Sequence, residues 1–248
     1  MIARGGRVDH MARAIYRLVL NRDAAPDIAR PDQLTSDFIA LDDPSAVLKG
    51  IGEAAISLWL PGWKWGDTTS VDTLVLLCQL AALGYSPIVE FGTFRGKTTY
   101  NLALNSPQGP VITIDSGGTD DSLSNLERIN YPSYTPGELF QGAAQEIRSK
   151  IHLLIGDSRE LDLTPYYNSC GLVFVDGGHS YEVCKSDSVA ALRLVRPGGV
   201  VIWDDAGPFW PGVQRAVGEL SKTNRIYYLR RLAMALLVQE GGQTDATP

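Results

Sequence analysis

The chain has 248 residues, 44% of them hydrophobic, so it can bury the core of one large domain, with or without a small appendage. Its 22 basic and 28 acidic residues give a net charge of −6, which argues against a nucleic-acid-binding protein that relies on bulk charge. The three cysteines show no metal-ligand spacing, and no apolar stretch reaches the length of a membrane span. We therefore expect a cytoplasmic protein with no nucleic-acid partner and no membrane span.

The first 65 residues follow a different pattern from the rest of the chain. Residues 9–20 carry apolar side chains at helical spacing and predict an amphipathic helix. Trp59, Trp63 and Trp65 lie close together, which fits either a lid over a pocket or packing of this segment onto the main domain. We expect residues 1–65 to form a small helical extension that serves as a cap or as the contact of a homodimer.

From residue 66 onward, helices alternate with short apolar strands. The predicted strands are 86–92, 110–115, 151–157, 171–176, 200–205, 225–230 and 234–240. The predicted helices are 70–84, 93–106, 138–149, 182–195 and 211–222. Ser70 can cap the first helix and Gly84 ends it. We expect residues 66–240 to form one domain and residues 241–248 a disordered tail.

This alternation predicts an α/β fold with a doubly wound, mostly parallel sheet. Strands that are apolar throughout are typical of sheets covered by helices on both faces. The last two predicted strands are expected to add an antiparallel edge strand, which gives seven strands in total. Ligands bind such sheets at the carboxyl ends of the strands, so the residues at those ends are the candidates for a functional site.

The first strand of this domain ends in an acid and a glycine turn. Gly92 permits a tight turn after Glu90, and Gly96 lets the backbone approach a ligand or pack against the next helix. This spacing differs from the three-glycine pattern that holds a pyrophosphate. A carboxylate beside the turn fits a ligand with an ammonium or sulfonium charge better than it fits a pyrophosphate.

Acids also follow the second and third strands. Asp115 lies 23 residues after Gly92 and can accept hydrogen bonds from both hydroxyls of a ribose. Asp157 can reach an adenine amino group, and Ser158 can either add a hydrogen bond or simply cap a turn. Together with Glu90, these residues fit an adenosine ligand with a charged tail.

Three further acids follow the fourth and fifth strands. Asp176 ends one of these strands and the pair Asp204 and Asp205 ends the other, so their carboxylates are expected to converge and to repel one another. A hard divalent cation such as Mg²⁺, which prefers oxygen ligands, would relieve that repulsion. The alternative is that one of the paired acids only caps the segment that follows.

Taken together, these stretches resemble the class I S-adenosylmethionine-dependent methyltransferases over roughly residues 65–240. The match is closest to bacterial small-molecule O-methyltransferases of the macrocin type. The stretches that carry it are IVEFGTFRGKTT, VITIDS, LLIGDS, LVFVDGGHSYE, LRLVRPGGVVIWDDA and PGVQRAV. The resemblance implies a Rossmann-like fold, S-adenosylmethionine as cofactor, and methyl transfer to a hydroxyl of a sugar or of a natural-product or glycan precursor.

The resemblance also implies which residues hold the cofactor. Glu90 and Gly92 would lie beside its methionine part, Asp115 would hold the ribose, and Asp157 with Ser158 would hold the adenine. The full set of expected cofactor-binding residues is Glu90, Gly92, Thr93, Gly96, Thr98, Asp115, Ser116, Asp157, Ser158 and Asp176.

Metal-dependent relatives hold Mg²⁺ with an acid after the fourth strand and an acidic pair after the fifth, which correspond to Asp176, Asp204 and Asp205. In catechol O-methyltransferase the base is a lysine three residues after the first of these acids, and His179 stands there in this chain. The chain thus departs from the catechol pattern and matches sugar-type relatives with a D-x-x-H turn. We predict that Asp176 and His179 are the catalytic residues, with His179 as general base. The alternative for His179 is a turn histidine bonded to the backbone.

The acceptor pocket is expected to involve residues 116–137 and 206–211, where Phe209 or Trp210 either stacks on a ring or sugar face or packs as a lid. Other functions stay open. A NAD(P)-dependent oxidoreductase lacks support because the middle glycine and a Tyr-x-x-x-Lys pair are missing. A non-catalytic S-adenosylmethionine-binding protein would not need the acid cluster. A metal-independent methyltransferase is a further alternative, and a chelator test would distinguish it from a metal-dependent one.

Overall fold

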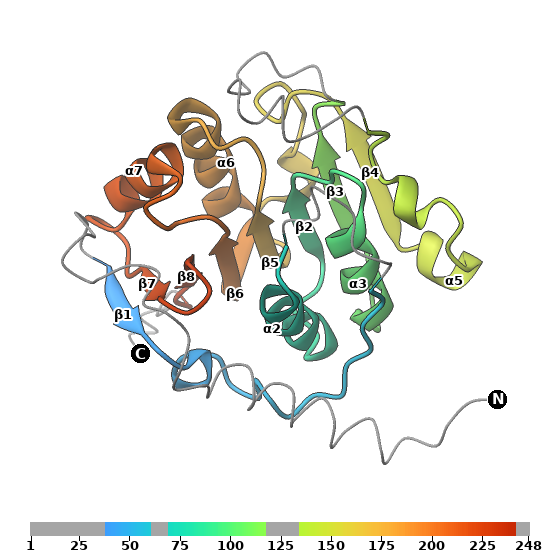
Figure 1. Cartoon of the computed structure of the whole chain (residues 1–248), viewed down its shortest axis with the longest axis horizontal. Helices are drawn as coiled ribbons and strands as arrows, with labels where there is room; N and C mark the ends of the chain where they lie inside the picture. The colour runs from blue at the N-terminus through green and yellow to red at the C-terminus, as the bar shows by residue number, and fades with distance from the viewer. Residues whose placement is uncertain (1–37, 61–68, 118–133, 242–248) are drawn as a thin grey trace, which may run out of the picture.

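The computed structural model describes residues 38–60, 69–117 and 134–241. The strands among these residues form one sheet in the order β1-β7-β8-β6-β5-β2-β3-β4 (Figure 1). Their bounds are β1 Ile39–Leu41, β2 Ile88–Phe91, β3 Val111–Asp115, β4 Ile151–Ile155, β5 Cys170–Val175, β6 Val195–Trp203, β7 Tyr227–Leu229 and β8 Met234–Val238. β8 is antiparallel to both of its neighbours, and all the other pairs are parallel.

Helices cover both faces of this sheet. The α-helices are α2 Val71–Ala82, α3 Lys97–Asn105, α5 Gln145–Arg148, α6 Tyr181–Leu194 and α7 Pro211–Leu220. The 3₁₀ helices are η2 Pro44–Ala46, η3 Glu138–Phe140 and η4 Thr164–Tyr166. α2, α3 and α5 contribute to one buried apolar cluster and α6 and α7 to the other, so the sheet separates two cores (Figure 1).

The predicted fold class is confirmed, and the strand count needs correction. The sheet has eight strands rather than seven among the described residues, because residues 39–41 add β1 beside β7. The expected antiparallel strand is β8, which lies near this edge of the sheet and is followed by β7 and β1. A run of three residues is too short to show the alternation by which strands are recognised in sequence.

Most element boundaries follow local signals in the sequence. Ser70 caps α2 as expected, since its hydroxyl oxygen accepts a hydrogen bond from the Thr73 amide at 3.0 Å. The helix predicted at 138–149 is instead divided into η3 and α5, with Gly142 between them. Glycine is a poor helix former, which favours an interruption at this point.

The stretch Pro197-Gly198-Gly199, which lies between the predicted helix 182–195 and the predicted strand 200–205, forms a bulge within β6. The register with β5 shifts between Cys170 and Leu172, which pair with Val195 and Val200. Gly198 has a φ of 75°, which suits glycine. The bulge lets the chain pass from α6 directly into the central sheet.

The described part of the N-terminal extension packs against the main sheet. Leu48, Ile51 and Ile56 are buried in the same core cluster as α2 and α3. The ring of Trp59 lies 4.4 Å from that of Tyr100 on α3, so this tryptophan packs onto the main domain. The division between extension and domain at residue 65 stays a prediction.

Several expectations fall on residues that the structure does not describe. They are the helix at 9–20, the positions of Trp63 and Trp65, most of the segment 116–137, and the disordered tail. Among the described residues, no helix combines the length and the apolar character that crossing a bilayer requires.

Candidate active site

The carboxyl ends of β2, β3, β5 and β6 meet at one edge of the sheet, because these strands are parallel to one another. The turn after β2 lies directly against the end of β5. Asp176 donates its amide hydrogen to the Phe91 carbonyl at 2.9 Å, and a Cβ at Gly92 would collide with the Asp176 carbonyl. Gly92 also has a φ of 96°, so glycine is required here on both grounds.

Gly96 is the N-cap of α3 with a φ of 90° and packs against a neighbouring segment, while its approach to a ligand stays a prediction. A Cβ there would lie 2.5 Å from the Phe140 ring, so only glycine lets Phe140 close against this turn. Of the two roles that the sequence left open for Gly96, the structure shows packing against the next elements.

Glu90 is a buried acid with one carboxylate oxygen unused. Its Oε2 accepts hydrogen bonds from the Thr99 and Thr113 hydroxyls at 2.5 and 2.6 Å. Its Oε1 is buried and has no hydrogen-bond partner among the described residues. Burial raises the pKa of this carboxyl to about 7. Buried acceptors are nearly always paired in folded proteins, so Oε1 is suited to a donor that arrives with a ligand.

Asp115 is largely engaged in holding the glycine turn. Its Oδ2 accepts a hydrogen bond from the Phe94 amide at 2.8 Å, and its Oδ1 accepts from the Gly117 amide at 2.8 Å and the Tyr134 hydroxyl at 3.1 Å. Burial raises the pKa of the Asp115 carboxyl, and these bonds lower it. A carboxylate offers about four acceptor positions, so roughly one remains for a ligand rather than the two that a ribose would use.

The threonines and the serine expected at the cofactor mostly face protein atoms or flank the site. Thr93 bonds the Thr113 hydroxyl at 2.6 Å, and Thr98 bonds the Thr69 hydroxyl at 3.0 Å. Ser116 follows β3 directly and is half-buried. Thr93 and Thr98 therefore shape the glycine turn and its helix.

The pair after β4 is held by the protein's own side chains. Asp157 forms an ion pair with Arg159, which lowers the pKa of the Asp157 carboxyl. The Ser158 hydroxyl donates to Asp187 Oδ1 at 2.6 Å, and Asp187 is buried within α6. The sequence analysis did not single out Asp187. An acid inside a helix that packs on the sheet was the available signal, because acids are rarely buried without a partner.

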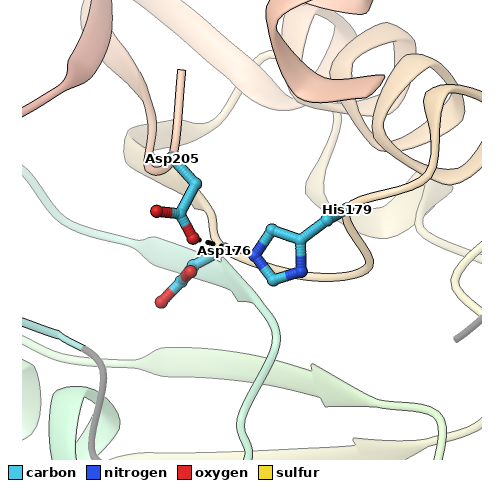
Figure 2. A group of neighbouring side chains, drawn as sticks. All are labelled: Asp176, His179 and Asp205. Atoms are coloured by element: carbon cyan, nitrogen blue, oxygen red, sulfur yellow. Dashed lines mark hydrogen bonds and ion pairs between the residues drawn. The ribbon is translucent and has the colours of Figure 1, made fainter. Parts of the chain in front are cut away.

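Among the described residues, Asp176, His179 and Asp205 lie together at the strand ends (Figure 2). One possible ligand atom from each lies within 4.8 Å of the others. His179 Nε2 is 2.8 Å from Asp205 Oδ2. Asp176 follows β5, His179 lies in the loop between β5 and α6, and Asp205 follows β6, so three segments supply the group.

Asp204 is not part of this group, although the sequence placed it among the metal ligands. Its Oδ1 accepts a hydrogen bond from the Asp205 amide at 3.0 Å, and its own amide donates to the Val175 carbonyl at 3.0 Å. His179 lies with Asp176 and Asp205 in this group, and the role of Asp204 as a metal ligand stays a prediction. Adjacent residues leave a strand in different directions, which a sequence pattern does not resolve.

Negative charge accumulates at these strand ends. Burial, and then the carboxylates of Asp204 and Asp205, raise the pKa of Asp176 well above its ordinary value. Burial and the neighbouring Asp205 raise the pKa of Asp204 to about 7. Asp205 has a φ of 54°, a left-handed conformation that costs free energy in residues other than glycine. A site of this kind favours a cation over an anion.

Trp210 packs on His179 rather than facing outward as an open platform. The two rings are stacked with centroids 3.9 Å apart and planes inclined by 21°. The neighbouring Phe209 is 80% exposed. Because His179 covers one face of the Trp210 ring, only the other face is left to stack on an acceptor.

The residues present fit the two groups that the sequence implied. The carboxylates of Asp176 and Asp205, together with the nearby Asp204, offer the oxygen donors that hard divalent cations bind in proteins. The unpartnered Glu90 Oε1, close to the glycine turn, fits the ammonium group of a methionine-containing cofactor.

Comparisons with known proteins agree with this picture. Residues 89–206 match the family model described as a methyltransferase domain. None of the curated proteins is similar enough in sequence to match the chain. Among solved structures, the O-methyltransferase NovP aligns with a TM-score of 0.57 at 15% identity, covering 94% of this chain and 99% of NovP.

Two further structures share the fold over nearly their whole length. A protein from Klebsiella pneumoniae, described as a candidate O-methyltransferase, aligns with a TM-score of 0.52 at 17% identity, covering 95% of this chain and 97% of its own. The calicheamicin methyltransferase CalS11 aligns with a TM-score of 0.50 at 16% identity, covering 96% and 94%. At these identities the likeness establishes the fold.

Proposed function

We propose that the protein moves a methyl group from S-adenosylmethionine to a hydroxyl of a small molecule, because residues 89–206 match the model of a methyltransferase domain and the fold is similar to that of the O-methyltransferase NovP. The acceptor we propose is a sugar or a natural-product or glycan precursor. The observation that carries the proposal is the group of Asp176, His179 and Asp205 beside the glycine turn. Acids and a base thus lie directly next to the turn that would hold the cofactor.

The cofactor is S-adenosylmethionine, which supplies a methyl group on a positively charged sulfur. Glu90 Oε1 is a buried acceptor suited to its ammonium group. Asp115 keeps roughly one acceptor position for a ribose hydroxyl. We propose that the loop after β4, which carries Asp157 and Ser158, contacts the adenine. When ionised, the carboxylates of Glu90 and Asp176 would lie close to the proposed place of the sulfonium and would favour binding of the charged methyl donor over its neutral product.

His179 is proposed as the general base. Its Nε2 faces the two acids, so a hydroxyl held beside them lies within reach of the nitrogen. In the contact of 2.8 Å between Nε2 and Asp205 Oδ2 one of the two atoms carries a proton, so Nε2 acts as the base once a substrate hydroxyl takes the place of Asp205 at this nitrogen. The carboxylate of Asp205 then stabilises the imidazolium that forms. The deprotonated oxygen forms the new bond to the methyl carbon as the carbon–sulfur bond breaks, and His179 then releases the proton to water.

Asp176 and Asp205, with Asp204 alongside, would hold a divalent cation, which we propose is Mg²⁺. Such a cation lowers the pKa of a bound hydroxyl. The crowding of three carboxylates supports this proposal, since the group is otherwise electrostatically unfavourable.

The names of the similar structures favour an oxygen acceptor. NovP is an O-methyltransferase, and CalS11 is a calicheamicin methyltransferase. Against a NAD(P)-dependent oxidoreductase stands the β2 turn, where Phe94 replaces the middle glycine of a pyrophosphate loop. Against a non-catalytic binding protein stands the costly acid cluster. Residence in the cytoplasm, a homodimer and the absence of a nucleic-acid partner stay predictions.

The test is transfer of labelled methyl groups from S-adenosylmethionine to a panel of sugars and phenols by wild type, His179→Gln and His152→Gln. His152 is exposed on β4 and serves as the matched control. We expect His179→Gln to lose at least about 100-fold in kcat while it still binds S-adenosylhomocysteine, because general bases contribute about 10²–10⁴ in rate. Equal activity of His179→Gln and wild type would contradict the role of His179.

A further inference from the structure

The start of α7 contacts His179 from two directions. The Trp210 ring stacks on the imidazole at 3.9 Å. Two residues later, a Cβ at Gly212 would collide with the His179 carbonyl oxygen and come within 2.7 Å of the Tyr181 amide. The ring of His179 and its backbone are thus both touched by one short segment of another element.

Trp210 is itself held firmly. It packs against the core cluster beneath α6 and α7, and its amide donates to the Gly207 carbonyl at 3.2 Å while its carbonyl accepts from the Gln214 amide at 3.0 Å. Pro211 is the first residue of α7, where its fixed φ favours the start of a helix. The tryptophan ring is therefore a rigid surface for its neighbour.

A histidine in a loop can rotate about two side-chain bonds. With one face of its ring covered and its carbonyl against Gly212, His179 keeps Nε2 directed at Asp205. Proton transfer requires the base within about 3 Å of the proton it takes, so a swing of the ring would cost rate without affecting the cofactor.

We propose that Trp210, supported by Gly212, is a positioning residue that holds His179 Nε2 toward Asp176 and Asp205 for proton transfer. This inference rests on the proposed function, because it gives a purpose to the geometry of the proposed base. It also assigns to the segment before α7 a function in catalysis in addition to any contact with the acceptor.

The first readout is nuclear magnetic resonance of the imidazole C–H groups in the cofactor-free protein. The chain has three histidines, so His10→Gln and His152→Gln suffice to assign the His179 signals. A stacked indole shifts these signals upfield. We expect the shift in wild type, part of it in Trp210→Phe, and none in Trp210→Leu. Unshifted His179 signals in wild type would overturn the proposal.

The second readout is steady-state kinetics on the same variants. We expect Trp210→Leu to lower kcat at least tenfold with little change in KM for S-adenosylmethionine, and Trp210→Phe to restore most of the loss. Tyr167→Leu, which changes an exposed aromatic side chain elsewhere, should leave kcat unchanged. Wild-type kcat in Trp210→Leu would overturn the inference alone. Absence of methyl transfer by wild type would overturn the proposed function and this inference together.

Gly212→Ala tests the same idea without touching either ring. The added methyl group must push the start of α7 away from His179, so we expect a lower kcat with an unchanged fold by circular dichroism. Gly142→Ala is the matched control, because a Cβ there meets nothing within 4 Å. Equal kcat in both alanine variants would contradict the role assigned to Gly212.

Discussion

At the residue scale, the ionised carboxylate of Glu90 is expected to lower the stability of the folded protein and to strengthen binding of the cofactor. Burial raises its pKa to about 7 in the folded protein from an ordinary value of 4.5. Between these two values the folded protein keeps a proton that the unfolded chain has released. Stability therefore falls as the pH rises through this window, and the loss is complete above pH 7.

Glu90→Gln removes this titration while keeping an oxygen for the two threonine hydroxyls. We expect the variant to unfold with a free energy up to about 3 kcal/mol greater than wild type at pH 8, and equal to it below pH 4.5. It should also bind S-adenosylhomocysteine more weakly at pH 8, because the carboxylate partner of the ammonium is gone. Urea unfolding and calorimetry measure the two effects.

Glu146→Gln is the control for this prediction, since Glu146 is an exposed acid in α5. It should change neither the pH dependence of unfolding nor the binding of the nucleoside. A Glu90→Gln protein that is less stable than wild type at pH 8 would contradict the assignment of Glu90 as a strained, buried acid.

Replacing Mg²⁺ with Mn²⁺ makes it possible to test whether His179 is the general base or a metal ligand. We expect Asp176→Asn to weaken Mn²⁺ binding at least tenfold, because a carboxylate ligand becomes an amide, and His179→Gln to leave it nearly unchanged. Electron paramagnetic resonance measures both the affinity and any coupling to a nitrogen nucleus. A nitrogen coupling that disappears in His179→Gln would show that the imidazole is a ligand and not the base.

The sequence predicted which residues stand at the strand ends, because glycines and acids after apolar runs are visible as a pattern. It did not predict that Ser158 would turn to Asp187 or that Trp210 would cover His179. These contacts join elements far apart in the chain and depend on side-chain rotamers, for which no local pattern exists. The placement of His179 beside both Asp176 and Asp205 has the same cause.

At the element scale, two asparagine side chains of α3 form hydrogen bonds with the backbone of residues 57–59. Asn101 accepts a hydrogen bond from the Trp59 amide at 2.8 Å and donates to the Trp59 carbonyl at 3.0 Å. One turn later, Asn105 makes the same two bonds to Ser57 at 2.8 and 2.7 Å. Because residues four apart lie on one face of a helix, the two amides together clamp residues 57–59.

Asn101→Ala should lower the free energy of unfolding by about 2 kcal/mol, because it leaves the part-buried amide and carbonyl of Trp59 unpaired. Asn105→Ala should cost less, since its contacts to Ser57 are exposed to water. Urea unfolding of the two variants measures the difference. Equal losses would mean that the clamp does not depend on burial.

Helices with a clear cap, such as α2, could be predicted closely, whereas the break between η3 and α5 could not. Their sequence has helical spacing throughout, and the observed break accompanies the packing of Phe140 against Gly96 and Gly137. Gly142 lowers the helix propensity at this point, but the packing of Phe140 against Gly96 is visible only in the folded chain.

At the scale of the whole molecule, the described N-terminal residues contribute to the cores on both faces of the main sheet. Phe38 stacks on Tyr228 with ring centroids 5.8 Å apart, Arg230 pairs with Asp42, and Leu48 is 1% exposed. A sequence with mixed composition and a three-residue strand gave no signal for this arrangement. The alternating elements after residue 66, in contrast, were sufficient to predict the class of the fold.

Leu48→Ala should therefore destabilise the whole protein by about 2–5 kcal/mol, the cost of a cavity in a packed core. Leu60→Ala is the control within the same segment, because Leu60 is 51% exposed. Unfolding followed both by far-ultraviolet circular dichroism and by tryptophan fluorescence should shift as one transition. A loss confined to one probe would show that residues 38–60 unfold separately from the sheet.

The central claim is that the strand ends bind S-adenosylmethionine beside a cation held by acids. Calorimetric titration of the full chain with S-adenosylhomocysteine, then with Mg²⁺, tests it most directly when repeated on Asp176→Asn and with NADH in place of the nucleoside. The account predicts micromolar binding of S-adenosylhomocysteine, no heat with NADH, and a Mg²⁺ heat that Asp176→Asn lacks. Binding of NADH without binding of S-adenosylhomocysteine would contradict the account.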